Sequence, residues 1–289
     1  MLVTPQLMHF RSLLFLSLML TCISFARANC VITDDTQVLI RLARPVQRVV
    51  SLSPDLTETS FAIGAGEKVV GVIDGADYPD AAKKRPIVGT YAGLDLERLV
   101  GLHPDLVVRW GQTFERQVAV LKKQGVPVYT SDPSKLSDVP RIMRQLGCLM
   151  GVSERAEVSA QQFEERLRRL KRRYADQPKA EVFLQIGAHT LLTVNKRSWM
   201  NEALAVCGGK NVFADAFLPA PEISAESLIQ ANPTVVISLS RETDWQAYWR
   251  HWPRLRAVRG HRLYQIDPDL LERPGPRLLD GVAAICAHL

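Results

Sequence analysis

The 289-residue chain is poor in residues that build metal sites, and it contains none of the common enzyme motifs. Its six histidines are scattered, and no cysteine spacing resembles a metal site. It has no nucleophile elbow (G-x-S-x-G), no phosphate-binding loop, no G-x-G-x-x-G after a strand and no H-E-x-x-H. These absences argue against an enzyme and against a receptor for zinc or manganese. We therefore expect neither a metal site nor a resident cofactor.

Long hydrophobic runs are missing after residue 28, since no later stretch approaches the roughly 20 apolar residues that span a bilayer. The start of the chain differs. His9 and Arg11 precede an apolar run over 13–25, and residues 26–28 form an A-x-A cleavage site. The pattern predicts a signal peptide over 1–28, so we expect the mature protein to be exported and soluble.

Cysteine content and charge limit the possibilities further. Without Arg11 and Arg27 the formal net charge falls from +6 to +4. Lysine and arginine are densest over 166–173, which is typical of a solvated helix face, and no nucleic-acid-binding motif accompanies them. We expect no nucleic-acid partner. An even number of cysteines in an exported protein suggests disulfides, although the four that follow the signal peptide allow three pairings: Cys30, Cys148, Cys207 and Cys286.

One segment of the sequence occurs twice. Residues 96–108 read LERLVGLHPDLVV and residues 225–237 read AESLIQANPTVVI, at a constant offset of 129. The offset aligns glutamate, leucine and proline in both copies: Glu97 with Glu226, Leu99 with Leu228, and Pro104 with Pro233. Each copy has the pattern of a short amphipathic helix, a proline that ends it, and a buried parallel strand. The repeat predicts two similar α/β lobes.

The remaining chain alternates apolar strands with amphipathic helices joined by short links, which favours largely parallel sheets. Further strands are predicted over 48–52, 69–73, 126–131, 181–186 and 261–266. Helices are predicted over 56–63, 115–124, 139–150, 199–206 and 277–289, with a hairpin over 34–44.

The segment between the two copies has a different character. Residues 154–175 are highly charged and contain no glycine or proline. Their apolar side chains recur at helical spacing, at Val158, Phe163, Leu167, Leu170 and Tyr174. This predicts one helix of about six turns, roughly 33 Å long. The fold class is therefore α/β, with two Rossmann-like lobes joined by one long rigid helix: signal peptide 1–28, first lobe 29–152, linking helix 153–177 and second lobe 178–289.

Eight segments carry a family resemblance and cover nearly the whole mature chain: RVVSLSP (48–54), DYP (77–79), DLERL (95–99), PDLVVRW (104–110), ERQ (115–117), VFLQIG (182–187), VCGGKNVF (206–213) and LLERPGPR (270–277). They resemble the periplasmic substrate-binding proteins of ABC importers for cobalamin and iron-siderophores, whose two lobes are joined by one long helix. The similarity is greatest to the members that bind vitamin B12. The resemblance implies a periplasmic monomer that captures cobalamin or a related corrinoid. An iron-siderophore or haem is the alternative ligand.

The resemblance also implies specific contacts. Cys207 and Cys286 correspond to a disulfide of that family, and we predict a second one between Cys30 and Cys148, both in the first lobe. The repeated glutamates Glu97 and Glu226 correspond to surface glutamates that dock on arginines of the dimeric permease. Two carboxylates, one on each lobe, are suited to a two-fold symmetric partner. The alternative interpretation is a pair of ordinary exposed glutamates.

The ligand of such proteins lies between the lobes, beside loops at the carboxyl ends of the strands. Tyr91 and Trp110 are predicted to be cleft walls, unless they belong to the first lobe's core. Arg273 could donate hydrogen bonds to the ligand and be held by Glu272, or both could form a local ion pair at the last helix. His189 could reach a metal centre of the ligand. The full predicted set is Asp77, Tyr91, Trp110, Leu192, Asp269, Leu270, Leu271, Glu272 and Arg273.

The chain departs from the vitamin B12-binding pattern where that pattern has aromatic side chains. It has smaller residues in place of a tyrosine, two tryptophans and a phenylalanine: Gly75, Ala220 with Leu270, and Leu192. The cleft is therefore expected to be more aliphatic, with leucines supplying apolar contact. A siderophore would call for several inward arginines, and the cleft loops offer few beyond Arg109 and Arg273.

Overall fold

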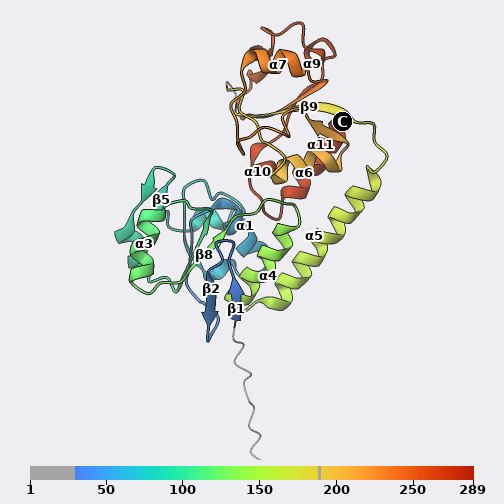
Figure 1. Cartoon of the computed structure of the whole chain (residues 1–289). Helices are drawn as coiled ribbons and strands as arrows, with labels where there is room; N and C mark the ends of the chain where they lie inside the picture. Colours follow the sequence, from blue (N-terminus) through green and yellow to red (C-terminus); the bar gives the residue numbers. More distant parts are fainter. Residues whose placement is uncertain (1–29, 188–189) are drawn as a thin grey trace, which may run out of the picture.

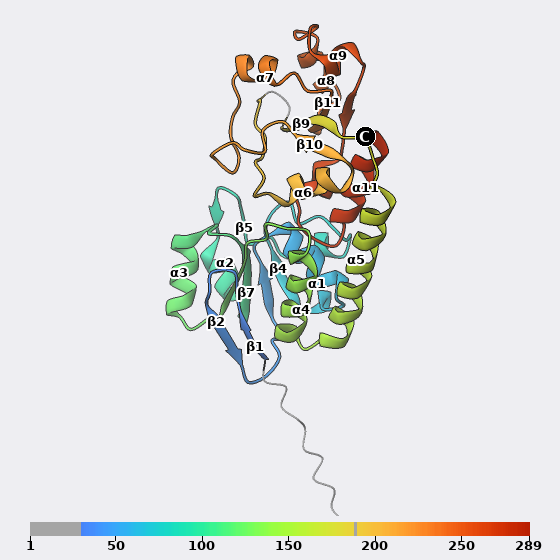
Figure 2. The ribbon, with the colours of Figure 1, turned by 45° about the vertical axis from the view of Figure 1, so that its right-hand side comes forward.

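The computed structural model describes residues 30–187 and 190–289, and these form two α/β lobes stacked end to end (Figures 1 and 2). The predicted signal peptide over 1–28 and His189 lie outside the described residues. Among the helices that the structure describes, none is long and apolar enough to cross a membrane.

The first lobe is built around a four-stranded parallel sheet in the order β4-β3-β7-β8. Its strands are β3 (Val49–Ser51), β4 (Val69–Val72), β7 (Leu106–Trp110) and β8 (Val128–Ser131). Four helices accompany it: α1 (Pro54–Ala62), α2 (Leu96–Gly101), α3 (Glu115–Lys123) and α4 (Asp138–Met150). Two antiparallel hairpins complete the lobe: β1 (Cys30–Thr33) with β2 (Leu39–Leu42), and β5 (Gly89–Thr90) with β6 (Gly93–Leu94).

The second lobe repeats this design with a parallel sheet in the order β10-β9-β11-β12. Its strands are β9 (Ala180–Ile186), β10 (Gly209–Asn211), β11 (Val235–Leu239) and β12 (Leu263–Gln265). Its helices are α6 (Trp199–Val206), α7 (Ala225–Ala231), α8 (Trp245–Trp249), α9 (Arg256–Arg259), α10 (Pro268–Leu271) and α11 (Leu278–His288). The α/β fold with two largely parallel sheets is thus confirmed. Strand β10 was not predicted, because its three residues, Gly-Lys-Asn, carry no hydrophobic pattern.

The linking helix α5 (Ser153–Arg173) runs along one side of the molecule from the far end of the first lobe to the second (Figures 1 and 2). Its buried residues are Ala156, Ala160, Phe163 and Leu167. The predicted stripe was therefore wrong at Val158, which is 55% exposed, because small alanines form the inner face there. A Cβ on Gly147 of α4 would lie 2.2 Å from Ala156 Cβ, so this glycine permits close helix packing.

One buried apolar cluster extends from the first sheet through α4 and α5 to α6 and α11 in the second lobe. An ion pair of 2.6 Å between Arg166 and Asp280 also ties α5 to α11. The linking helix is therefore packed against both lobes along its length. Such packing favours a fixed lobe arrangement over a freely hinged one.

The repeat is reproduced in three dimensions. Asp95 and Ser224, again 129 residues apart, cap α2 and α7 by accepting a hydrogen bond from the backbone N–H three residues on. Before each proline the chain takes a left-handed conformation, with φ of 46° at His103 and 43° at Asn232. Strands β7 and β11 then begin and end at the same offset. The repeated sequence therefore encodes one structural unit used twice.

Both predicted disulfides are present. Cys30 is bonded to Cys148 with Cα atoms 5.5 Å apart, which fastens the first hairpin to α4. Cys207 is bonded to Cys286 with Cα atoms 4.7 Å apart, which joins the end of α6 to α11. Each disulfide closes a long loop, of 118 and 79 residues in sequence separation, within its own lobe.

Candidate functional site

The lobes meet where the first sheet's strands end, and an aromatic pair lies in this contact. Trp110, the last residue of β7, packs edge-to-face on Trp199 at the start of α6, with ring centroids 6.5 Å apart. Trp199 is held in turn because its indole Nε1 donates a 2.7 Å hydrogen bond to the carbonyl of Leu271. Trp110 remains 39% exposed, so part of its ring is available to a ligand.

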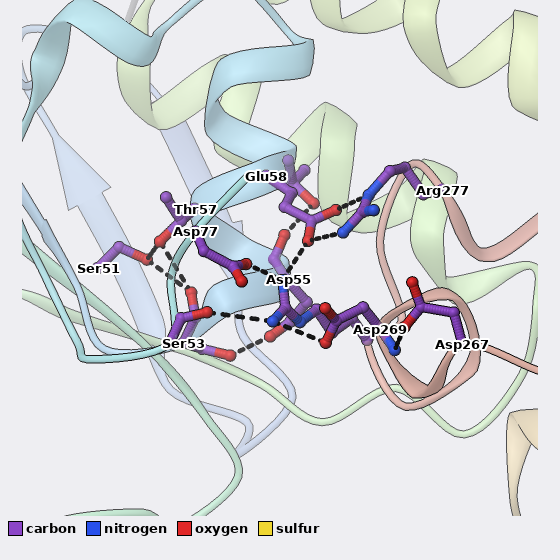
Figure 3. A network of polar contacts seen from close by, with 12 residues as sticks. Ser51, Ser53, Asp55, Thr57, Glu58, Asp77, Asp267, Asp269 and Arg277 are labelled. Carbon is purple, nitrogen blue, oxygen red and sulfur yellow. Dashed lines mark hydrogen bonds and ion pairs between the residues drawn. The ribbon is translucent and has the colours of Figure 1, made fainter. Parts of the chain in front are cut away.

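A cluster of charged side chains forms a second contact between the lobes (Figure 3). We call Glu58, Asp77, Asp269, Arg273 and Arg277 the interlobe ion cluster. Glu58 of α1 is buried, and its carboxylate accepts hydrogen bonds of 2.9 Å from Arg273 and 2.7 Å from Arg277. Arg273 also contacts Asp77 and Asp269, each at 2.7 Å. Opposite charges from the two lobes are therefore paired at this junction.

The loop that carries both arginines lies directly on the first lobe. The Arg277 guanidinium lies 3.9 Å from the ring centroid of Tyr78. A Cβ on Gly275 would lie 3.4 Å from the backbone oxygen of Asp55, so the loop reaches the N-terminal turn of α1. The ion cluster and this backbone contact together set the separation of the lobes on this side.

Residues 49–270 match the family model described as periplasmic binding protein. The chain belongs to the periplasmic binding protein family. The vitamin B12-binding protein of Vibrio parahaemolyticus is 33% identical over 246 residues, which cover 84% of this chain and 90% of that protein.

Two solved structures are also similar. The crystal structure of the periplasmic vitamin B12 binding protein of Vibrio cholerae has a TM-score of 0.78 and 30% identity, covering 84% of this chain and 96% of that one. The structure of a periplasmic heme binding protein from Pseudomonas aeruginosa has a TM-score of 0.76 and 31% identity, covering 84% and 92%. The family resemblance and the two-lobed fold predicted from the sequence are thereby confirmed.

The predicted partner of Arg273, Glu272, requires correction. Its side chain is held by Glu58, Asp77 and Asp269, whereas Glu272 is exposed and forms no ion pair with it. The alternative of a purely local ion pair is also wrong, because Glu58 and Asp77 belong to the first lobe. Sequence spacing could not reveal this, since Arg273 and Glu58 lie 215 residues apart.

Two residues that the sequence placed at the cleft are buried. Leu271 of this binding protein is fully buried in the core on the inner side of α10, so it is not a cleft wall. Arg109 is also buried: it pairs with Glu115 at 2.6 Å and donates a hydrogen bond to the Thr113 carbonyl. Leu270 is half-buried in the same short helix.

The remaining predicted walls are accessible. Tyr91 lies at the turn between β5 and β6 and is 67% exposed, so neither it nor Trp110 belongs to the first lobe's core. Leu192 is half-buried and forms isolated β-bridges with Ile186, the last residue of β9, and with Glu222. These positions place apolar surface at the carboxyl ends of strands in both lobes, where ligands of α/β proteins bind.

An exposed apolar loop was missed from the sequence. Phe217 is 91% exposed and Leu218 is 56% exposed. Backbone hydrogen bonds from Thr193 to Pro221 and from Asn195 to Pro219 hold this loop against the segment that follows β9. The loop therefore lies at the carboxyl-end side of the second sheet. The sequence carries no clear signal of it, because apolar residues such as Val212, Phe213 and Ile223, which pack on the core, surround the exposed pair.

Asp55 is a buried carboxylic acid at the junction of the lobes. Burial raises its pKa to about 6, although a hydrogen bond from the Ser53 hydroxyl lowers it, and the negative charge of Glu58 raises it further. Its Oδ2 atom is buried without a hydrogen-bond partner in the described structure. Ionised Asp55 is thus costly to the folded state at neutral pH.

Asp55→Asn is expected to stabilise the protein at high pH. Because the pKa of Asp55 in the folded protein lies above its ordinary value of 3.8, Asp55 favours folding at low pH, and this contribution is lost as pH rises through about 6. The variant should therefore exceed wild type by about 1–3 kcal/mol at pH 8 and match it near pH 4. Urea unfolding at both pH values tests this, with the exposed Asp74→Asn as control. Equal stability differences at pH 4 and pH 8 would contradict the assignment.

Proposed function

We propose that this protein captures cobalamin or a related corrinoid between its lobes in the periplasm and delivers it to an ABC importer. The observation that carries the proposal is similarity to vitamin B12-binding proteins over more than four-fifths of both chains. Membership of a binding-protein family supports transport over catalysis. We propose that the protein is a monomer with a cleaved signal peptide and without enzymatic activity or a resident cofactor.

The chemistry of the cleft supports a large apolar ring system as ligand. Exposed aromatic and aliphatic side chains lie toward the carboxyl ends of strands in both lobes: Tyr91, Trp110, Phe217 and Leu218. Burying such surface provides about 25 cal/mol per Å². Phe217 and Leu218 could replace apolar contact that the small Ala220 does not provide.

The charges favour a corrinoid over an anionic iron-siderophore. Arg273 is paired with carboxylates in the interlobe ion cluster, and Arg109 is buried with Glu115. Neither guanidinium is therefore left with an unbalanced charge for a polyanionic chelate.

Haem is the second candidate. The heme binding protein from Pseudomonas aeruginosa is as similar in sequence and nearly as similar in structure as the vitamin B12 binding protein from Vibrio cholerae. Tyr91 is an exposed phenol at the cleft, and tyrosine is one of the side chains that hold haem iron. A shift of the haem Soret band that Tyr91→Phe abolishes would support this candidate.

Trp110→Ala and Phe217→Ser should each weaken cyanocobalamin binding by about tenfold, equivalent to about 1.4 kcal/mol. Both changes remove apolar surface on which a corrin ring could pack. Quenching of intrinsic fluorescence during titration gives the affinity of wild type and variants. Leu39→Ser is the matched control, because Leu39 is 49% exposed in the hairpin at the far end of the first lobe (Figure 1). Wild-type affinity in both cleft variants would contradict the proposed ligand wall.

A further inference from the structure

The two copies of the repeated unit diverge after their strands. Strand β7 is followed by the nine-residue helix α3, whereas β11 is followed by the five-residue helix α8. The next strands, β8 and β12, start at Val128 and Leu263, so the offset has grown from 129 to 135. The second lobe therefore has an irregular segment over 250–255 that has no counterpart in the first.

This segment forms a surface pocket with the end of α7. The pocket has a volume of about 520 Å³ and is lined by Ile229, Asn232, His251, Trp252, Pro253, Arg254 and Leu255. Four of these side chains are apolar, and the other three, Asn232, His251 and Arg254, are polar. Leu255 is buried, whereas Ile229 is 56% exposed. The pocket thus combines apolar walls with direct access from solvent.

Hydrogen bonds hold the pocket in shape. Asn232 ends α7, and its side-chain oxygen accepts a 2.9 Å hydrogen bond from the backbone of Arg256. The Arg256 side chain donates to the Asn232 carbonyl and pairs with Glu181 of β9. Trp252 packs on Tyr248 with ring centroids 6.3 Å apart. These contacts connect both sides of the pocket to the second sheet and its core.

The pocket is continuous with the proposed docking surface. Ile229 lies three residues after Glu226 on α7, so both side chains lie on one face of the helix. The first lobe has the equivalent pair, Glu97 and Val100, and Val100 is also exposed, at 39%. Helices α2 and α7 lie on the same, left-hand side of the molecule in Figure 2. One partner could therefore contact both.

We propose that the permease of the importer inserts an apolar side chain into the pocket beside Ile229, and that this side chain lies next to the basic permease residue that pairs with Glu226. The inference rests on the proposed docking through Glu97 and Glu226. The acidic Glu226 selects a basic neighbour, and the apolar walls select an aliphatic or aromatic side chain. In the first lobe, Val100 is the residue equivalent to Ile229, but the segment over 250–255 has no counterpart there. The two halves of a symmetric permease would therefore make unequal contacts.

Ile229→Trp tests the pocket because the larger side chain would obstruct it from an already exposed position. Ile229→Ser removes one apolar wall, and Val100→Ser is the matched control in the first lobe. The probe is the vitamin B12 importer of the same bacterium, purified in detergent and immobilised. We expect Ile229→Trp to weaken binding of the loaded protein at least tenfold, Ile229→Ser about fivefold and Val100→Ser less than threefold.

Cyanocobalamin titration of each variant separates this inference from the proposed function. All three variants should retain wild-type affinity for cyanocobalamin. Wild-type importer binding by Ile229→Trp would overturn the pocket while leaving the proposed function intact. Absence of cyanocobalamin or importer binding by the wild-type protein would overturn both. Self-association that Ile229→Trp abolishes would assign the pocket to a second copy of this chain, and would also contradict the inference.

Discussion

Replacing both Glu97 and Glu226 by arginine is expected to abolish transport while leaving ligand affinity unchanged. Both side chains are exposed in the first turn of their helices, and each helix is capped by a hydrogen-bonding side chain. The substitutions should therefore leave the fold intact. Like charges opposed across an interface cost several kcal/mol, so affinity for the permease should fall more than about 100-fold.

The matched control carries the same total change in charge elsewhere. Glu154 and Asp176 are exposed near the two ends of the linking helix, away from α2 and α7. The double variant Glu154→Arg and Asp176→Arg should transport cyanocobalamin like wild type. Uptake into proteoliposomes that contain the importer provides the readout, and calorimetry measures ligand affinity. Retained uptake by the Glu97→Arg and Glu226→Arg double variant would exclude the docking role.

Glu58→Ala should have the largest effect on stability. The change leaves Arg273 and Arg277 without the buried carboxylate that both contact. Removal of one partner from a buried ion pair costs about 3–5 kcal/mol, and the free energy of unfolding in urea should fall by about this amount. The lobes should also separate, because Glu58 is a first-lobe residue held by the second lobe.

Small-angle scattering distinguishes separation of the lobes from a local loss of packing. We expect a larger radius of gyration for Glu58→Ala than for wild type. Asp280→Ala is the control, because it breaks the half-exposed pair with Arg166 and should cost less than about 1 kcal/mol. An unchanged urea midpoint together with an unchanged radius of gyration would show that the ion cluster does not hold the lobes.

Local patterns predicted the repeated units well. Periodicity and the helix-ending proline placed α2 with β7 and α7 with β11, because both signals act within a dozen residues. The same reasoning missed β10, whose short polar strand pairs with β9 only through the backbone. It also misread the inner face of α5 at Val158, since packing selected the smaller Ala156 and Ala160.

The site was less predictable because its contacts join distant segments. Trp110 could be placed at the cleft from its position at the end of a strand. The partner of Arg273 could not be predicted, because Glu58 belongs to the other lobe. The residues next to Glu58 in the sequence carry no sign of the pairing. Leu271 and Leu270 are adjacent in sequence, yet only Leu271 is fully buried, because the orientation of α10 against α11 decides their exposure.

Calorimetric titration of the mature wild-type protein with cyanocobalamin, followed by displacement with haem, tests the central claim most directly. We expect one cyanocobalamin per chain, a dissociation constant of about 1 µM or lower, and no displacement by an equimolar amount of haem. Stoichiometric binding of haem by a protein that gives no heat with cyanocobalamin would contradict the assignment of a corrinoid ligand.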